Sequence, residues 1–222
     1  MSRGLPERLR DYLNEKYKSE KWFHPYKIVE RERKKEKWEL RTDWYDGCGG
    51  IREYADGNVW ILSGPLAYLG DGLHNVLLRL YDSRIRSAKN EDEEKRFYDE
   101  LYKEEEDILG DILHRRNLNK YLKEKEFRDL IIDVLWSEEI ARRISQEFRV
   151  EVKYLIDDVK WRTYFYSAFD SKNMDENRKF EEIVKRVEAI HAACKTYRLY
   201  DENEDYKKFK KKVLAEKKTS YS

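Results

Sequence analysis

The sequence predicts a protein of the α+β class, in which antiparallel β-hairpins pack with a majority of α-helices. Apolar residues recur at helical spacing through most of the chain, whereas two stretches, at about 26–62 and 149–166, show the alternation that is typical of strands. Hairpins that are distant in sequence can share one antiparallel sheet. Because the 222 residues contain no low-complexity linker, we expect a single domain over 1–222.

The first β-rich stretch is expected to hold two hairpins. Apolar and charged residues alternate over 37–44, as in a half-buried strand, and the segment YKIVERE before it is the expected partner strand. In the segment IREYADGNVWIL, Asp56-Gly57 lies between two β-rich runs, where a tight turn needs the positive φ that glycine adopts. The segment DGCGG at 46–50 is then expected to be the loop between the two hairpins.

A third hairpin is expected at 149–166. Apolar residues alternate with charged or long side chains from Val150 to Ile156, and the segment VKWRTYFY is the expected return strand. Asp157-Asp158 supplies a turn between them.

Helices are expected in the rest of the chain. Pro65 is placed to open the second of them as its first residue, and Ser137, followed by two glutamates, is placed to cap the fifth. The expected helices cover residues 5–18, about 65–87, 91–114, 124–136, 137–148, 174–199 and 204–217. Glu105 falls within the apolar arc of its helix, so we expect it to have a partner.

Composition limits the partners that the whole chain can attract. The 47 basic and 46 acidic side chains leave a net charge of +1, so binding to nucleic acid must come from local patches. One glutamine and four threonines beside this Lys/Glu/Arg content are typical of thermophile proteins. The chain has no run of eighteen apolar residues and no apolar signal segment, so we expect a cytoplasmic protein without a membrane partner.

The C-terminal segment is the most basic part of the chain. Residues 206–222 hold seven lysines and one glutamate, and helix 204–217 has a narrow apolar stripe that begins with Tyr206 and Phe209. Such a helix can dock its stripe on the protein and present ammonium groups to phosphates. The predicted phosphate ligands are Lys207, Lys208, Lys210, Lys211 and Lys212.

A second basic cluster lies at the tip of the first expected hairpin, where a β-ribbon can follow a nucleic-acid backbone. Its residues are Arg31, Arg33, Lys34, Lys35 and Lys37. Aromatic residues that could stack on unpaired bases lie close to basic residues in sequence. They are Trp22, Phe23, Tyr26, Trp38, Tyr164 and Tyr166. The sequence therefore predicts nucleic acid as the partner, without distinguishing DNA from RNA.

The histidines supply a possible metal site. An acid precedes His74, His114 and His191 by three residues, but only His191 points toward the core, together with Cys194. We expect no cofactor other than zinc, for which Glu188, His191, Cys194 and Cys48 are the candidate ligands. The alternative is a core histidine beside a buried cysteine.

The segment RVEAIH gives His191 a second interpretation. Its spacing is similar to the Arg-x4-His motif of the HEPN ribonucleases, and the resemblance covers six residues. It implies that Arg186 and His191 act together on an RNA phosphodiester, often across a dimer. A metal-dependent ribonuclease centred on Arg186, Glu188 and His191 is the related alternative, so the sequence leaves open whether the protein is an enzyme.

A third hypothesis is a non-catalytic assembly protein. Residues 91–107 hold ten acids and three bases, so this helix could meet the basic tail of another copy and form a homo-oligomer. The motifs of P-loop nucleotidases, dinucleotide-binding enzymes, serine hydrolases and zincin proteases do not occur, which argues against those classes.

Overall fold

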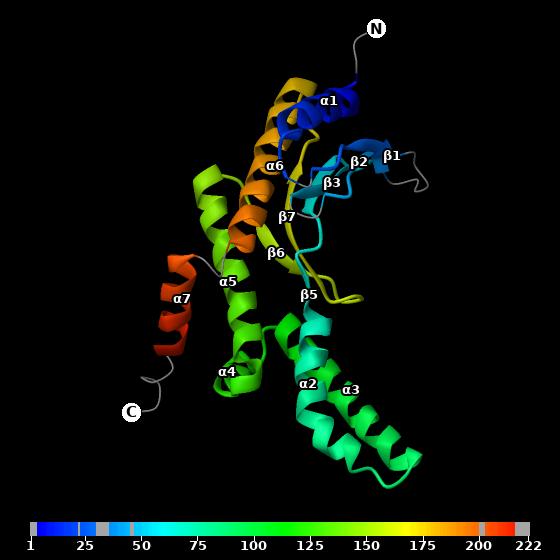
Figure 1. The fold of residues 1–222 in the computed structure, drawn as a ribbon. Helices are drawn as coiled ribbons and strands as arrows, with labels where there is room; N and C mark the ends of the chain where they lie inside the picture. The colour runs from blue at the N-terminus through cyan, green and yellow to red at the C-terminus, as the bar shows by residue number, and fades with distance from the viewer. Residues whose placement is uncertain (1–3, 22, 30–35, 45–46, 200–202, 216–222) are drawn as a thin grey trace. The chain divides into compact units, whose positions relative to one another are not determined.

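A computed structural model describes residues 4–21, 23–29, 36–44, 47–199 and 203–215. The chain forms two compact units, each assembled from separate segments. Unit 1 comprises residues 1–66, 137–155 and 164–203, and unit 2 comprises residues 67–136, 156–163 and 204–222. The α+β class is confirmed, because the described residues form seven helices and an antiparallel sheet (Figure 1).

The sheet joins hairpins that are distant in sequence, as predicted. Its strand order is β1-β2-β3-β4-β7, followed by β5, and β6 also pairs with β7. The strands are β1 (Lys27–Val29), β2 (Glu36–Arg41), β3 (Cys48–Tyr54), β4 (Asn58–Ser63), β5 (Ala67–Tyr68), β6 (Lys153–Ile156) and β7 (Arg162–Asp170). Within unit 1 the register aligns Leu40, Ile51, Ile61 and Ser167 across four strands.

Two helices cover one face of the unit 1 sheet. Helix α1 (Leu5–Tyr17) contacts β1 and β2, and α6 (Glu176–Arg198) contacts β3, β4 and α1 (Figure 1). Every fourth or third residue of α1 is apolar, and Leu9 and Leu13 of this stripe are fully buried. The side chains of β3 and β4 alternate between buried and partly exposed, which identifies a sheet with one covered face.

The β3–β4 hairpin turns at the predicted Asp56-Gly57 pair. Gly57 has φ +85°, and its N–H donates to the Tyr54 carbonyl at 3.0 Å. The Asp56 carboxylate accepts from the Asn58 N–H at 3.0 Å, which completes the turn.

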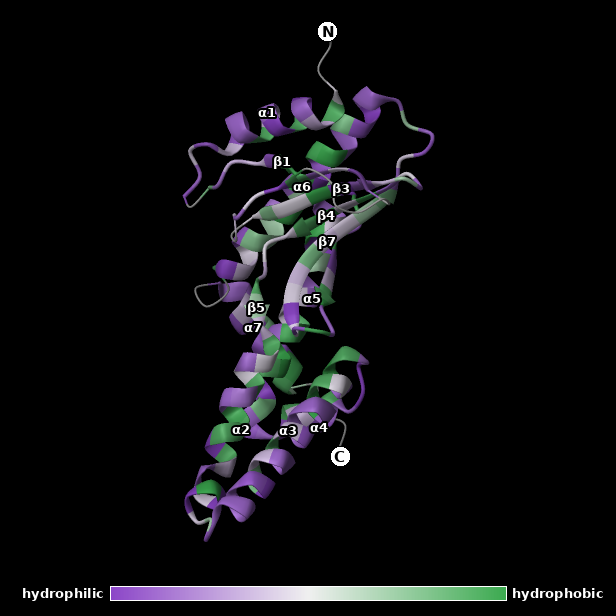
Figure 2. Cartoon of the chain, turned by 90° about the vertical axis from the view of Figure 1, so that its right-hand side faces the viewer, coloured by the Kyte–Doolittle hydropathy of each residue, from purple (hydrophilic) through white to green (hydrophobic). Residues whose placement is uncertain are grey.

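Unit 2 is mainly helical. It contains α2 (Leu69–Arg86), α3 (Glu91–Leu113), α4 (Leu118–Lys123), the first half of α5 (Lys125–Phe148) and α7 (Glu204–Ala215). Helices α2 and α3 pack against each other, and much of α3 is hydrophilic (Figure 2). Glu105 has a partner, as expected: the Nδ1 of His74 lies 2.7 Å from its carboxylate.

Three local predictions were wrong. Residues 48–50 of DGCGG belong to β3 and do not form a loop, because they pair with β2 and β4. Pro65 does not open a helix, since β5 follows it and α2 begins only at Leu69. Ser137 caps no helix, because the buried stripe from Ile131 to Ile144 continues through it and keeps α5 in one piece.

The other predicted helices occur within a few residues of their expected bounds, as α1, α3, α6 and α7. Residues 216 and 217 of the last one lie outside the described residues. No helix in the described ranges combines the length and the apolar character needed to cross a membrane.

We expect Gly57→Ala to lower the free energy of unfolding by about 1–2 kcal/mol, because an L-residue is strained at this φ. The new Cβ would also lie 2.5 Å from Lys172 Cγ and 3.3 Å from the Lys172 nitrogen. Urea unfolding of the whole chain measures the effect. Gly50→Ala is the matched control, because its Cβ would meet only the Leu40 oxygen at 3.7 Å. Equal loss in both variants would contradict this account.

Candidate nucleic-acid interface

The basic helix α7 is docked on α5 through its apolar stripe, as its sequence pattern predicts. The Tyr206 ring meets the Trp136 ring edge-on at 5.6 Å, and Phe209 lies 5.2 Å from the same ring. The buried Tyr206 also donates its hydroxyl hydrogen to Asp133 Oδ1 at 2.9 Å. These contacts fix which side of α7 faces the protein.

The lysines of α7 divide into two groups. Lys210 is half-buried, and its ammonium lies 2.6 Å from Asp129 Oδ1 on α5. The remaining four, Lys207, Lys208, Lys211 and Lys212, are exposed. Lys207 and Lys208 are paired with Glu204 and Asp205 at 2.6 and 3.8 Å, but exposed pairs of this kind contribute little and exchange readily. Lys210 therefore faces α5, while the side chains of the other four are exposed to solvent.

The second predicted basic cluster is only partly visible. Arg31, Arg33, Lys34 and Lys35 lie outside the described residues. Lys37 is exposed at the start of β2, where its ammonium lies 3.1 Å from the buried carboxylate of Glu53.

Glu53 gives Lys37 a structural partner. Burial opposes ionisation of Glu53, but hydrogen bonds from Lys179, Lys37 and Trp38 outweigh it and lower the pKa of the carboxyl. Lys179 Nζ and Trp38 Nε1 lie 2.8 and 2.7 Å from its oxygens. Lys37 thus helps to neutralise the buried carboxylate of Glu53, whether or not it also contacts a phosphate.

His191 lies in an aromatic cluster of unit 1. Its ring is 4.8 Å from Tyr17 and 4.6 Å from Trp44, and Phe23 meets Trp44 edge-on. Neither imidazole nitrogen has a hydrogen-bond partner in the part of the chain that the structure describes. Burial lowers the pKa of His191 to about 4; Lys195 and Lys16 act in the same direction, and Glu20 opposes them. The ring is therefore neutral at pH 7.

Arg186 faces a different neighbourhood. Its Nη1 donates to Ser167 Oγ at 2.7 Å and to the Ala168 carbonyl at 3.3 Å, both on β7. Its Nε donates to Glu182 at 3.0 Å, and the guanidinium lies over the Phe169 ring. Arg186 and His191 thus have separate partners, so the geometry does not favour joint catalysis, and the ribonuclease hypothesis stays a prediction.

The four candidate zinc ligands are not gathered into one site. Glu188 pairs with Lys16 of α1, whereas Cys194 Sγ is 3.8 Å from the Gly47 carbonyl. Cys48 is fully buried, and burial raises the pKa of its thiol to about 11, which disfavours the thiolate that zinc requires. No three His, Cys, Asp or Glu side chains are grouped to hold a metal within the described ranges.

The face of the unit 1 sheet opposite α1 and α6 is a surface that the sequence did not reveal. We call it the open face and define it by Arg41, Arg52, Trp60, Leu62 and Tyr166. The Trp60 and Tyr166 rings stack at 5.4 Å with an interplanar angle of 12°. Only Tyr166 was among the predicted stacking residues. The alternation of β4, with Val59 and Ile61 buried and Trp60 exposed, is the pattern that could have identified it.

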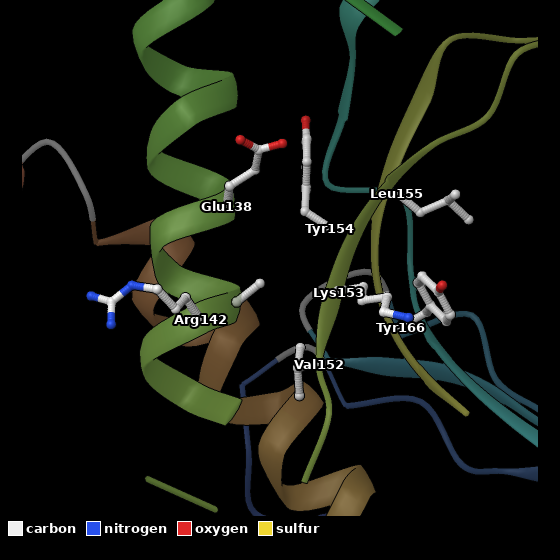
Figure 3. A pocket seen from close by; sticks show the side chains of 8 residues that line it. Glu138, Arg142, Val152, Lys153, Tyr154, Leu155 and Tyr166 are labelled. Carbon is white, nitrogen blue, oxygen red and sulfur yellow. The ribbon is translucent and has the colours of Figure 1, made fainter. Parts of the chain in front are cut away.

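A shallow hollow of about 320 Å³ adjoins Tyr166 (Figure 3). Side chains from α5, β6 and β7 line it. Lys153 extends toward the Tyr166 ring, whereas Arg142 points away from the strands (Figure 3). Its polar lining residues include Glu138, Arg142, Lys153 and Tyr154.

Comparison with known proteins leaves these surfaces to be interpreted from their own chemistry. No protein-family model, no curated protein and no solved structure matches this chain.

We expect unfolding free energy to fall by up to about 3 kcal/mol between pH 6.5 and pH 4 because of His191. Its pKa is lowered in the folded state, so the unfolded chain binds the proton first, and stability is lost as pH falls through this window. Urea unfolding at several pH values measures the effect. His191→Phe removes this component, whereas His114→Gln, at an exposed site, leaves it. An identical pH dependence in the wild type and His191→Phe would contradict it.

Proposed function

We propose that this protein binds nucleic acid through the exposed lysines of α7. The observation that carries the proposal is the orientation of α7. Tyr206 and Phe209 hold one side of the helix on α5, where Lys210 also pairs with Asp129, so that the exposed lysines lie on the other side.

The spacing of these lysines suits a backbone ligand. Lys207 and Lys211 are four residues apart, as are Lys208 and Lys212, so the two pairs lie on neighbouring turns of one helical surface. Each ammonium that meets a phosphate releases a condensed counterion. Binding of this kind depends on the phosphate charges and not on the base sequence, so it applies to DNA and RNA alike.

The near-zero net charge is compatible with this proposal. At physiological salt the Debye length is about 8 Å, so a phosphate close to α7 is little affected by acidic groups farther away. The described residues of α7 hold five lysines against two acids, Glu204 and Asp205, so the helix carries a local positive excess that the net charge of +1 does not predict.

We expect the combined change of Lys207, Lys208, Lys211 and Lys212 to Gln to weaken binding at 0.1 M salt by tenfold or more. The slope of log K against log salt should become shallower by about 3, because four phosphate contacts are lost. Fluorescence anisotropy with labelled duplex and single-stranded oligonucleotides measures both quantities. Stability should be unchanged, because Tyr206, Phe209 and Lys210 remain.

A matched control changes four exposed lysines elsewhere to Gln, and it should retain wild-type affinity. The control positions are Lys18, Lys89, Lys95 and Lys103. Equal weakening in the control would show that only total charge matters, and no binding by the wild type at low salt would overturn the proposal.

A further inference from the structure

We propose that the open face of the unit 1 sheet stacks unpaired bases, which makes single-stranded nucleic acid the ligand of this surface. The inference rests on the proposed function, because it assumes that the chain binds nucleic acid. It adds a second binding surface and the class of ligand that this surface takes.

The open face is aromatic at its centre. Trp60 is 36% exposed, although its strand neighbours Val59 and Ile61 are fully buried. Because Trp60 and Tyr166 are already stacked, a planar base can extend the stack over an exposed ring face. Aromatic side chains bind any base in this way, since every base has a π-face.

Positive charge borders the aromatic pair. Arg52 is the register partner of Trp60 on β3, and it shares the Glu39 carboxylate with Arg41 at 2.9 Å each. The Glu39 side chain is only 7% exposed, whereas Arg41 is 54% exposed. Two guanidinium groups therefore cover one carboxylate, which leaves one net positive charge toward solvent and suits a phosphate backbone.

Small residues leave room beside the rings. Ala168 is the register partner of Trp60 on β7, and Gly50 lies between Arg41 and Leu62 in the neighbouring row. A Cβ added at Gly50 would meet only the Leu40 oxygen, at 3.7 Å. At these two positions no large side chain projects from the sheet, so a base can approach the aromatic pair.

The same features favour single strands over duplexes. In a duplex the base faces are stacked on one another and are not available to a protein ring, whereas a single strand can turn its bases outward. Lys153 lies beside Tyr166 at the edge of the hollow, but its ammonium is paired with Glu151 at 2.9 Å, so the positive charge of the open face comes from Arg41 and Arg52 (Figure 3).

The test compares Trp60→Val with Trp60→Phe, because valine keeps the strand preference but removes the ring that phenylalanine retains. Anisotropy is measured with a twelve-nucleotide oligo-uridine, a twelve-nucleotide oligo-thymidine and a twelve-base-pair DNA duplex. We expect Trp60→Val to weaken single-strand binding about tenfold, with the duplex affinity and the salt slope unchanged. Trp60→Phe should recover most of the loss.

Two further variants complete the design. Tyr102→Ala removes an aromatic side chain that is 52% exposed on α3, and it should leave all affinities unchanged. Gly50→Leu places a large side chain beside the aromatic pair, where a base would lie, and should also reduce single-strand binding. If Trp60→Val does not unfold in urea like the wild type, Gly50→Leu decides the result.

The outcomes separate this inference from the proposed function. If single strands bind but neither Trp60→Val nor Gly50→Leu weakens them, the open face takes no bases, while the role of α7 stands. If the wild type binds none of the three probes, both proposals fail.

Discussion

The pairing of β4 with β7 is the contact on which unit 1 depends. It joins Asn58–Leu62 to Tyr166–Asp170, segments more than a hundred residues apart, and so makes one sheet from separate hairpins. On the covered side α6 lies against both strands: it contacts β4, and its Arg186 donates to Ser167 and Ala168 of β7. Because α6 occupies that side, the Trp60–Tyr166 stack is left on the other.

The interior of unit 1 accommodates polar groups in two ways. Glu53 and Arg186 are buried as ions, and each has several charged or polar partners, which offset the cost of leaving water. His191 is buried among aromatic rings without a hydrogen-bond partner in the described ranges, and it remains neutral instead. The three residues of the metal-dependent ribonuclease hypothesis thus have different physical roles: Arg186 supports the sheet, Glu188 pairs with α1, and His191 packs in the core.

The two proposed surfaces use different parts of nucleic-acid chemistry. Helix α7 offers ammonium groups to phosphates, an interaction that salt weakens strongly. The open face offers rings to bases, with guanidinium groups beside them, an interaction that a duplex cannot satisfy. Each surface lies within its own unit and is defined by contacts inside that unit.

The sequence by itself determined the local elements and the basic helix. The helices at 5–17, 91–113 and 176–198 and the turn at Gly57 follow from short-range patterns, and so does the docking stripe of α7. The prediction that residues 1–222 form a single domain concerns whether the two units fold independently, and it stays a prediction. Only the tertiary structure decided that α5 continues through Ser137, that Cys48 opens a strand, and that Trp60 is exposed. Alternation separates the two faces of a strand, but which face is covered depends on helices far away in the sequence.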